Sequence, residues 1–280
     1  MLQKQGIYSI VCMVVLFAIL HLGFPSEQHG PRTTGTTLLG GIAFLLMTCS
    51  VILSTRAPVF EGMFGGLDRM YQVHRVVGVM AAIFALVHFF GVPKELPEGV
   101  DPVTNAMFPS VPLGMLSLIF LVIGLFIALN RKIRYSFWRP THKIMALVNI
   151  LVVGHFFTAP AIFVEQFSPS GLMLLAAAAF GMVCLIYSLF GMNKRTALPF
   201  AIETINTLER ATEIVLKPKG AMMKFKPGQF AFVEIQGKGW SEPHPFTISS
   251  SPDEDRLRFT VKVLGDWTRK VREELQPGAE

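Results

Sequence analysis

Long apolar stretches separated by short polar segments dominate the first two thirds of the chain. A helix needs about 20 mostly apolar residues to cross a bilayer, and six stretches are close to that length. Glycine and proline gather in the connections between them, as they do where helices end. The pattern therefore predicts an α-helical membrane bundle of six transmembrane helices within residues 1–192. The expected helices cover residues 7–24, 36–54, 71–92, 112–129, 141–160 and 171–192.

The pattern changes after residue 192, where charged residues become frequent and apolar residues alternate with polar ones. Residues 230–235 and 257–263 have the alternation and the β-branched and aromatic content that are typical of strands. We therefore expect residues 193–280 to form a second domain, an antiparallel β-barrel or sandwich. The turn sequences beside its strands are Pro227-Gly228 and Ser251-Pro252-Asp253.

Composition supports membrane insertion, because charged residues make up only 16% of the chain, against roughly 25% in soluble domains. The formal net charge of +6 raises the question of a nucleic-acid partner. The cations flank apolar stretches instead of forming a basic face, so we expect no nucleic acid and a lipid bilayer around the helices. Cys12, Cys49 and Cys184 stand singly in apolar stretches, without the spacing of a metal or redox site.

Lysine and arginine lie mainly in one alternating set of connections, which predicts the orientation of the helices. The opposite set contains only Arg32 and Lys94. We expect the richer set to face the cytoplasm, so that both termini of this multi-pass protein of the cell membrane, plasma or inner, are cytoplasmic. A signal peptide at the N-terminus fits less well, since no clear small-residue cleavage site follows the first apolar stretch. The cations expected in the cytoplasm are Lys4, Arg56, Arg69, Arg75, Arg131, Lys132, Arg134, Arg139, Lys143, Lys194 and Arg195.

Four of the seven histidines lie within expected helices, where an ionisable side chain is costly and suggests a function. His74 and His88 are 14 residues apart (88 − 74) on the third helix, and His142 and His155 are 13 apart (155 − 142) on the fifth. At about 1.5 Å per residue, each pair spans roughly 20 Å along its helix. Both helices run outward, so His74 shares the inner depth with His142, and His88 shares the outer depth with His155. Matched depths indicate two bis-histidine haems, with these imidazoles as axial ligands of the haem irons.

The spacing on the fifth helix fits this arrangement less well than the spacing on the third. At about 100° per residue, 14 residues return to within roughly 40° of the starting face, whereas 13 residues leave a mismatch of roughly 140°. We therefore expect a local distortion of the fifth helix, or ligands that approach their haems from different sides.

Other functions of the four histidines explain less of the pattern. Zinc or copper requires ligands that converge within a few ångströms, which histidines about 20 Å apart on one helix cannot do. A proton relay usually includes aspartate or glutamate, and residues 71–92 and 141–160 contain neither. Arg75, beside His74, either pairs with a haem propionate or serves only as a topology-setting cation.

Three short strings in the C-terminal domain carry a resemblance to known proteins. In this order and spacing they resemble the flavin domain of the ferredoxin-reductase superfamily, in the version found in the ferric reductase and NADPH oxidase family. That family also carries two histidine pairs, so the resemblance covers nearly the whole chain. It implies that the β-barrel domain binds FAD. The strings are Pro227-Gly-Gln-Phe230, His244-Pro-Phe-Thr-Ile-Ser-Ser250 and Gly265-Asp-Trp-Thr268.

The resemblance also implies roles for single residues around the flavin ring. Phe246 would pack on the ring, Thr247 would reach its N5 atom, and Ser249 would belong to the same cofactor site. The alternative for this string is a plain β-strand.

On the phosphate side of the cofactor, the resemblance implies that His244 and Pro245 shape the strand and that Lys262 faces the pyrophosphate. Gly265 and Thr268 would open a helix whose N-terminal amides bind phosphate. The alternative for this string is a turn followed by a helix cap.

The function that the resemblance implies is that of a transmembrane oxidoreductase. Electrons would pass from cytoplasmic NAD(P)H through FAD and two b-type haems to an external acceptor, ferric iron or dioxygen. No separate catalytic side chain is expected, since the cofactors do the chemistry. No Gly-rich nucleotide loop follows the flavin strings, so we expect the NAD(P)H domain to be missing, through truncation or because a separate reductase supplies electrons.

Two other functions account for less of the sequence. A respiratory-type cytochrome b subunit that exchanges electrons with quinone needs no flavin string. A six-helix transporter or scaffold needs neither that string nor paired histidines. On the outer side, His21 and His29 either bind ferric chelates or are ordinary surface histidines.

Overall fold

The computed structural model describes residues 4–25, 30–92, 110–130, 132–159, 168–191, 197–237, 240 and 243–279. The chain divides into two compact units. The helical unit comprises Met1–Gly65 and Arg69–Asn193, and the β unit comprises Gly66–Asp68 and Lys194–Glu280. Some of the residues that the sequence singles out lie outside the described ranges. They are His29, Lys94, Arg131, Lys194 and Arg195.

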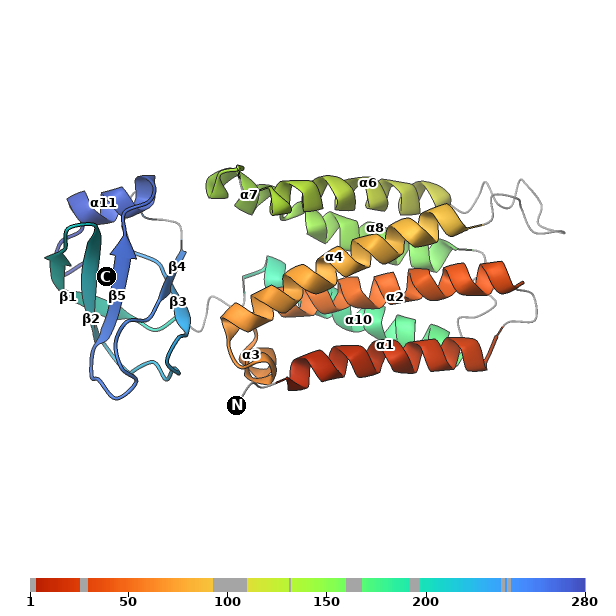
Figure 1. Ribbon diagram of the computed structural model, residues 1–280, viewed down its shortest axis with the longest axis horizontal. Coiled ribbons are helices and arrows are strands. Elements are labelled where there is room, and N and C mark those ends of the chain that lie inside the picture. The colour runs from red at the N-terminus through yellow and green to blue at the C-terminus, as the bar shows by residue number, and fades with distance from the viewer. Residues whose placement is uncertain are drawn as a thin grey trace. The chain divides into compact units, whose positions relative to one another are not determined.

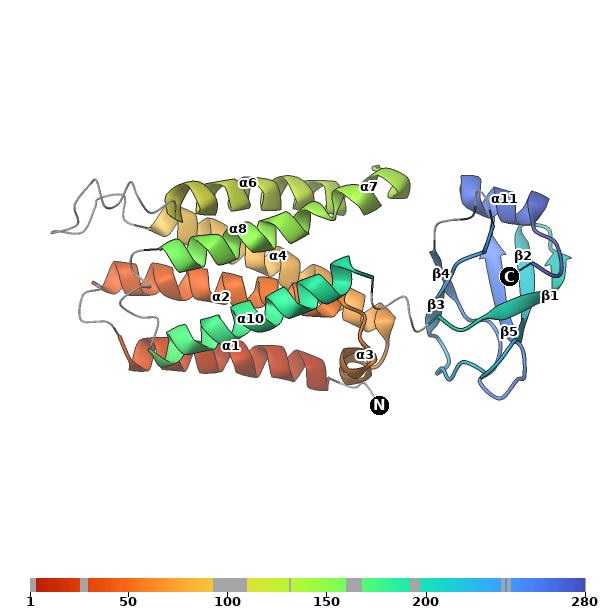
Figure 2. The ribbon, with the colours of Figure 1, turned by 180° about the vertical axis from the view of Figure 1, so that it is seen from behind.

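Six helices of the described chain are long and apolar enough to cross a membrane, as the sequence predicts. They lie side by side with their long axes roughly aligned (Figures 1 and 2). The protein is therefore a multi-pass membrane protein. The helices are α1 (Gln5–Gly23), α2 (Pro31–Ser54), α4 (Leu67–Gly91), α6 (Ser110–Leu129), α8 (Ile144–Thr158), whose span begins at Phe137, and α10 (Pro169–Leu189).

Burial in the helical unit follows the needs of a protein surrounded by lipid. Phe17, Leu45 and Val148 are completely buried between helices. Phe90 and Phe126 are 73% and 68% exposed, which would be unfavourable in water but suits contact with acyl chains. Among the six spans, α2 is the most buried.

Three features of the helical unit differ from the sequence prediction. A short helix, α3 (Pro58–Phe64), lies between α2 and α4 and is not predicted by the apolar pattern. Helix α4 begins at Leu67, so it includes Asp68 in its first turn, where a carboxylate favours the positive end of the helix dipole. The fifth span consists of two helices, α7 (Tyr135–Thr141) and α8, which meet at His142 and Lys143.

The β unit contains five described strands, all paired in antiparallel fashion as expected. The sheet order is β1-β2-β5 in one sheet and β3-β4 in the other. A bridge between Ile248 and Phe259 connects the second sheet to the first, so the described strands form two joined sheets without a continuous closed ladder. The elements are β1 (Phe200–Thr207), β2 (Ala211–Pro218), β3 (Phe230–Val233), β4 (His244–Thr247), β5 (Leu257–Lys262) and α11 (Asp266–Glu274).

The two strands expected from the sequence are present as β3 and β5, and the helix expected after Gly265 is present as α11. Strands β1 and β2 are additional to the sequence prediction. Their inward side chains, such as Ile202 and Ile214, pack with Phe259 of β5 in the core of the β unit.

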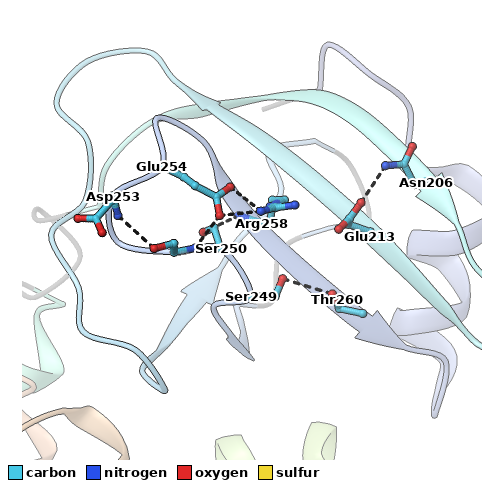
Figure 3. Close-up of polar contacts among 9 residues, drawn as sticks. Asn206, Glu213, Ser249, Ser250, Asp253, Glu254, Arg258 and Thr260 are labelled. Atoms are coloured by element: carbon cyan, nitrogen blue, oxygen red, sulfur yellow. Dashed lines mark hydrogen bonds and ion pairs between the residues drawn. The ribbon is translucent and has the colours of Figure 1, made fainter.

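A polar loop before β5 is held together by one carboxylate (Figure 3). Glu254 accepts a hydrogen bond from the backbone N–H of Ser251 at 2.8 Å and forms an ion pair with Arg258. The N–H of Ser251 and then the guanidinium of Arg258 lower the pKa of Glu254 below its usual value. Arg258 also donates its backbone N–H to the hydroxyl of Ser250 at 3.1 Å, so the loop is tied to the strand at two points.

Because the folded-state pKa of Glu254 is lowered, its contribution to stability is present above the unfolded pKa of about 4.3 and is lost as the pH falls through the folded pKa. We expect Glu254→Gln to speed amide exchange of residues 251–258 at neutral pH, relative to intrinsic rates. The difference from the parent should vanish in acid, where Glu254 is protonated. Hydrogen exchange across this pH range measures the effect. The exposed Asp253→Asn is the matched control, and equal exchange in the Glu254 and Asp253 variants would contradict the assignment.

Candidate functional site

The four membrane histidines form two pairs across the bundle. The ring centres of His74 on α4 and His142 at the α7–α8 junction are 6.2 Å apart, with 75° between their planes. The ring centres of His88 on α4 and His155 on α8 are 6.3 Å apart, with 69° between their planes. The pairing is the one that the matched depths predict.

The separation within each pair suits a shared iron. An imidazole nitrogen lies about 2 Å from a bound metal, and the ring centre lies about 1 Å further away. Two rings on opposite sides of one metal therefore have centres roughly 6 Å apart. Both pairs have this spacing, and the residues present thus fit axial ligation of two haems.

Three of the four rings are fixed by main-chain carbonyls of a neighbouring helix. Nδ1 of His74 lies 2.9 Å from the carbonyl oxygen of Ser50, and Nδ1 of His88 lies 2.7 Å from that of Thr36. Nδ1 of His155 lies 2.8 Å from the carbonyl oxygen of Ser110. A carbonyl can only accept, so each Nδ1 carries the proton and Nε2 keeps the lone pair that binds a metal. Histidines that bind a metal through one ring nitrogen usually donate the N–H of the other ring nitrogen to a nearby acceptor.

The carbonyls that His88 and His155 contact each lie one turn before a glycine. Gly40 is one turn after Thr36, and a Cβ there would lie 2.8 Å from Nδ1 of His88. Gly114 is one turn after Ser110, and a Cβ there would lie 2.8 Å from Nδ1 of His155. Any larger residue at these positions would push the ring away from its acceptor. The same device therefore occurs on α2 and on α6.

The distortion expected in the fifth helix lies at His142 itself. Lys143, Met145 and Ala146 donate their backbone N–H groups to carbonyls three residues back, the pattern of a 3₁₀ turn. A 3₁₀ turn rotates about 120° per residue instead of 100°, which reduces the angular mismatch of the 13-residue spacing. Pro140, two residues before His142, cannot donate a backbone N–H and favours the break.

In the β unit, the register brings two of the three flavin strings together. Phe230, at the end of the first string, pairs with Thr247 of the second, and Ile248 donates its N–H to the carbonyl of Gln229 at 3.0 Å. Ser249 then donates its N–H to the carbonyl of Arg258 on β5 at 2.8 Å. The second string therefore runs from one sheet to the other.

Alternation along β4 divides the residues of the second string between two faces. His244 and Phe246 are half-buried on one face, and Thr247 on the other is exposed. Trp267 of the third string covers the first face. Its ring lies 4.2 Å from that of His244 and is stacked 5.4 Å from that of Phe246.

An exposed polar face lies on the other side of these strands. Ser249 accepts a hydrogen bond from the hydroxyl of Thr260 at 3.3 Å (Figure 3). Lys262, two residues after Thr260 on β5, is exposed on the same face. It lines a surface hollow of about 390 Å³ together with three arginines and two carboxylates, namely Arg210, Arg269, Arg272, Glu209 and Glu273. Hydroxyl groups and cations on one face are suitable donors for the polar chain and the phosphates of a flavin nucleotide.

The hydroxyl of Thr268 has a structural role at the start of α11. It accepts hydrogen bonds from the N–H groups of Leu264 and Gly265 at 2.9 and 3.0 Å. Its hydroxyl is donated to the carbonyl of Gly265 at 3.0 Å. The helix-cap alternative for the third string is therefore present in the fold, and phosphate contact at this helix would fall to backbone N–H groups.

Two family models match this chain. Residues 39–153 match the model described as "Ferric reductase like transmembrane component", which includes His74, His88 and His142. Residues 199–279 match the model described as "FAD-binding domain", which includes all three flavin strings. Together the two matches cover more than half of the chain.

The chain belongs to the ferric reductase and NADPH oxidase family.

Several curated relatives are similar to this chain. Dual oxidase 2 of Rattus norvegicus is 22% identical over 275 residues, which cover 88% of this chain and 18% of the relative. A superoxide-generating NADPH oxidase heavy chain of Dictyostelium discoideum is 28% identical over 152 residues, 54% of this chain and 27% of the relative. Respiratory burst oxidase homolog protein D of Arabidopsis thaliana is 46% identical over 56 residues, 20% of this chain and 6% of the relative. The matched part is less than a third of each relative.

A likeness to a solved structure is weaker. A flavohemoglobin from Malassezia yamatoensis, with bound FAD and haem, gives a TM-score of 0.33 and 17% identity over 91% of this chain and 62% of that chain. This is too distant to carry an argument about the fold.

One sequence expectation about this ferric reductase and NADPH oxidase relative is wrong. His21 is not a surface histidine, because only 7% of it is exposed. Its Nε2 lies 3.2 Å from the carbonyl oxygen of Thr34 and 3.1 Å from the hydroxyl of Thr37, and its ring stacks on Phe17. His21 thus joins α1 to α2. Arg75, in contrast, is exposed on α4, which leaves both of its expected roles open.

Several residues of the site carry little or no signal in the sequence. Thr36, Ser50 and Ser110 accept the Nδ1 hydrogen bonds through main-chain carbonyls that every residue has. The hydroxyls of Ser50 and Ser110 also lie 3.0 and 3.3 Å from the same Nδ1 atoms, but a serine in an apolar helix does not by itself indicate this contact. Gly40 and Gly114 carry a signal, since an isolated glycine in a helix suggests close approach of another group.

Proposed function

We propose that this chain binds two b-type haems and one FAD as the electron-transferring part of a membrane oxidoreductase. One haem would be held by His74 and His142, and the other by His88 and His155. The observation that carries the proposal is the pair of facing imidazoles at each of two depths, about 6 Å apart and mostly anchored through Nδ1.

When bound, FAD and haem supply the redox chemistry, since a flavin exchanges electrons in pairs or singly and a haem exchanges one. The protein holds and orients them. The histidine Nε2 atoms would ligate the irons, and the carbonyls of Ser50, Thr36 and Ser110 would fix the rings. The surrounding apolar helices exclude water from the ligands.

In the β unit, we propose that FAD binds to the residues that the resemblance implies. Thr247, Ser249 and Lys262 are exposed on the β unit, which supports contact with the ring edge and the pyrophosphate. Phe246 and His244 would contact the cofactor from the half-buried face. Trp267 already packs on this face, so the cofactor and Trp267 would share it.

We propose the reaction class of the relatives for the whole protein, namely oxidation of NAD(P)H in the cytoplasm and reduction of ferric iron or dioxygen on the other side. Lysine and arginine on one set of loops support a cytoplasmic β unit and cytoplasmic termini in the cell membrane. The match of residues 199–279 to an FAD-binding domain argues against a quinone-linked cytochrome b and against a transporter.

A reduced-minus-oxidised absorption spectrum of the detergent-purified chain tests the proposal. We expect low-spin b-type bands, about two haems and about one FAD per chain. The haems are expected after expression with ample haem supply, because the ligand pairs are already formed. A purified, folded chain without haem under those conditions would overturn the proposal for the helical unit. FAD is measured separately, so its absence would affect only the β unit.

A further inference from the structure

The four proposed haem ligands are not held in the same way. On α4, His74 and His88 reach the carbonyls of Ser50 and Thr36, and these acceptors are 14 residues apart on α2, as the histidines are on α4 (88 − 74 and 50 − 36). The two antiparallel helices therefore stay in register over both ligands. On the other side, His155 reaches Ser110 of α6, but Nδ1 of His142 is buried without a hydrogen-bond partner among the described residues.

The fifth span is interrupted at the ligand that lacks an acceptor in the described part of the chain. If α8 continued as a regular helix in the register of His155 and Ser110, His142 would lie at the depth of residue 123 of α6 (155 + 110 − 142), on a face turned about 140° from that of His155. Instead, α8 begins only at Ile144, and His142 lies between α7 and α8 as the residue that follows α7. His142 therefore does not share the helix register that gives His155 its acceptor at Ser110.

Another side chain contacts the ring of His142. Trp138 lies one turn earlier on α7, and its ring is stacked on the imidazole, with 5.3 Å between ring centres and 29° between planes. The backbone N–H of His142 donates to the carbonyl of Trp138 at 2.8 Å, which sets the two residues one above the other. The indole of Trp138 therefore covers one face of the His142 ring. Nδ1 of this ring has no carbonyl acceptor among the described residues.

We propose that Trp138 is the positioning residue of His142, and that it takes the place of the carbonyl acceptor used by the other three ligands. This rests on the proposed haem ligation. An indole face restricts rotation of the imidazole about its bond to Cβ, but unlike a carbonyl it accepts no hydrogen bond from Nδ1. The inner haem site therefore has one ligand fixed by a hydrogen bond and one fixed by stacking, whereas the outer site has two fixed by hydrogen bonds.

The test uses the full chain with bound haem and three variants. Trp138→Leu removes the ring, Trp138→Phe keeps an aromatic face, and Phe137→Leu is the matched control, since Phe137 is the neighbouring residue and is 57% exposed. The readout is the electron paramagnetic resonance of the ferric low-spin haems, whose g-values depend on the angle between the two imidazole planes. Haem content and the midpoint potential of each haem are measured on the same samples.

In Trp138→Leu we expect one of the two low-spin signals to move or broaden, with a changed midpoint potential, while the other signal stays unchanged. In a His88→Ala background, which retains only the inner haem, the remaining signal should be the one that moves. Trp138→Phe should restore it, and Phe137→Leu should resemble the parent.

Parental signals and potentials in Trp138→Leu would overturn the inference. If Trp138→Leu does not fold, Trp138→Met takes its place, and parental signals and potentials in that variant would overturn the inference in the same way. A parent chain without haem would instead contradict the proposed function.

Discussion

Replacing His88 with alanine should lower the haem content from about two to about one per chain and leave the FAD content unchanged. His88 and His155 face each other as one pair, so the loss of one imidazole leaves that iron with a single axial ligand. His74 and His142 lie roughly 20 Å away along their helices and should keep their haem. Haem and flavin are quantified from absorption after extraction, and the remaining bands should belong to one low-spin species.

His21→Ala is the matched control for this experiment. His21 is also a buried histidine of the helical unit, but its Nε2 is occupied by Thr34 and Thr37 of α2. The control should retain both haems even if it loosens the contact between α1 and α2. The pairing is refuted if His88→Ala keeps both haems, or if it loses FAD while both haems remain.

Replacing Gly40 with alanine should weaken binding of the haem proposed for His88 and His155, although Gly40 is not itself a proposed ligand. The new Cβ would lie 2.8 Å from Nδ1 and 2.9 Å from Cε1 of His88, which is closer than real Cβ atoms approach other groups. The imidazole must therefore move away from the carbonyl of Thr36, and its orientation is lost. Loss of such a supporting interaction typically costs about 10- to 100-fold in metal affinity. Titration of haem into haem-depleted protein measures the change.

Gly35→Ala on the same helix provides the control, because a Cβ at Gly35 meets nothing within 4 Å. Alanine has a better helix propensity than glycine by about 0.5–1 kcal/mol, so this variant should fold at least as well as the parent. Unchanged affinity in both variants would show that the close approach over Gly40 is not needed for haem binding. Gly114→Ala makes the same test at His155 and should affect the same haem.

Much of the arrangement of the four membrane histidines follows from regularities of the chain. Helical rise is constant, so the positions of His74, His88, His142 and His155 in the sequence give their depths once the spans and their directions are known. Pairing at matched depths then needs no knowledge of side-chain packing. The observed pairs have this arrangement. Pro140 is a readable signal for the break at His142, because proline removes a helical hydrogen bond.

The β unit is less predictable. Strands β1 and β2 contain alternation but no distinctive string, so the sequence does not separate them from the connecting segments. The packing of Trp267 on His244 and Phe246 joins residues more than 20 positions apart (267 − 246 = 21), and nothing local in the sequence indicates it. The resemblance correctly indicates an FAD-binding domain, since residues 199–279 match the model of such a domain.

The two kinds of information differ in what they depend on. The amino-acid pattern alone is enough for the six membrane spans, the two-part organisation of the chain and the depth of each histidine, because hydrophobicity and helical rise are local properties. The acceptors for Nδ1 of His74, His88 and His155, the need for glycine at 40 and 114, and the stacking of Trp138 on His142 emerge only from the folded chain. These depend on the register and spacing of one helix against another, which many side chains set together and no single segment encodes.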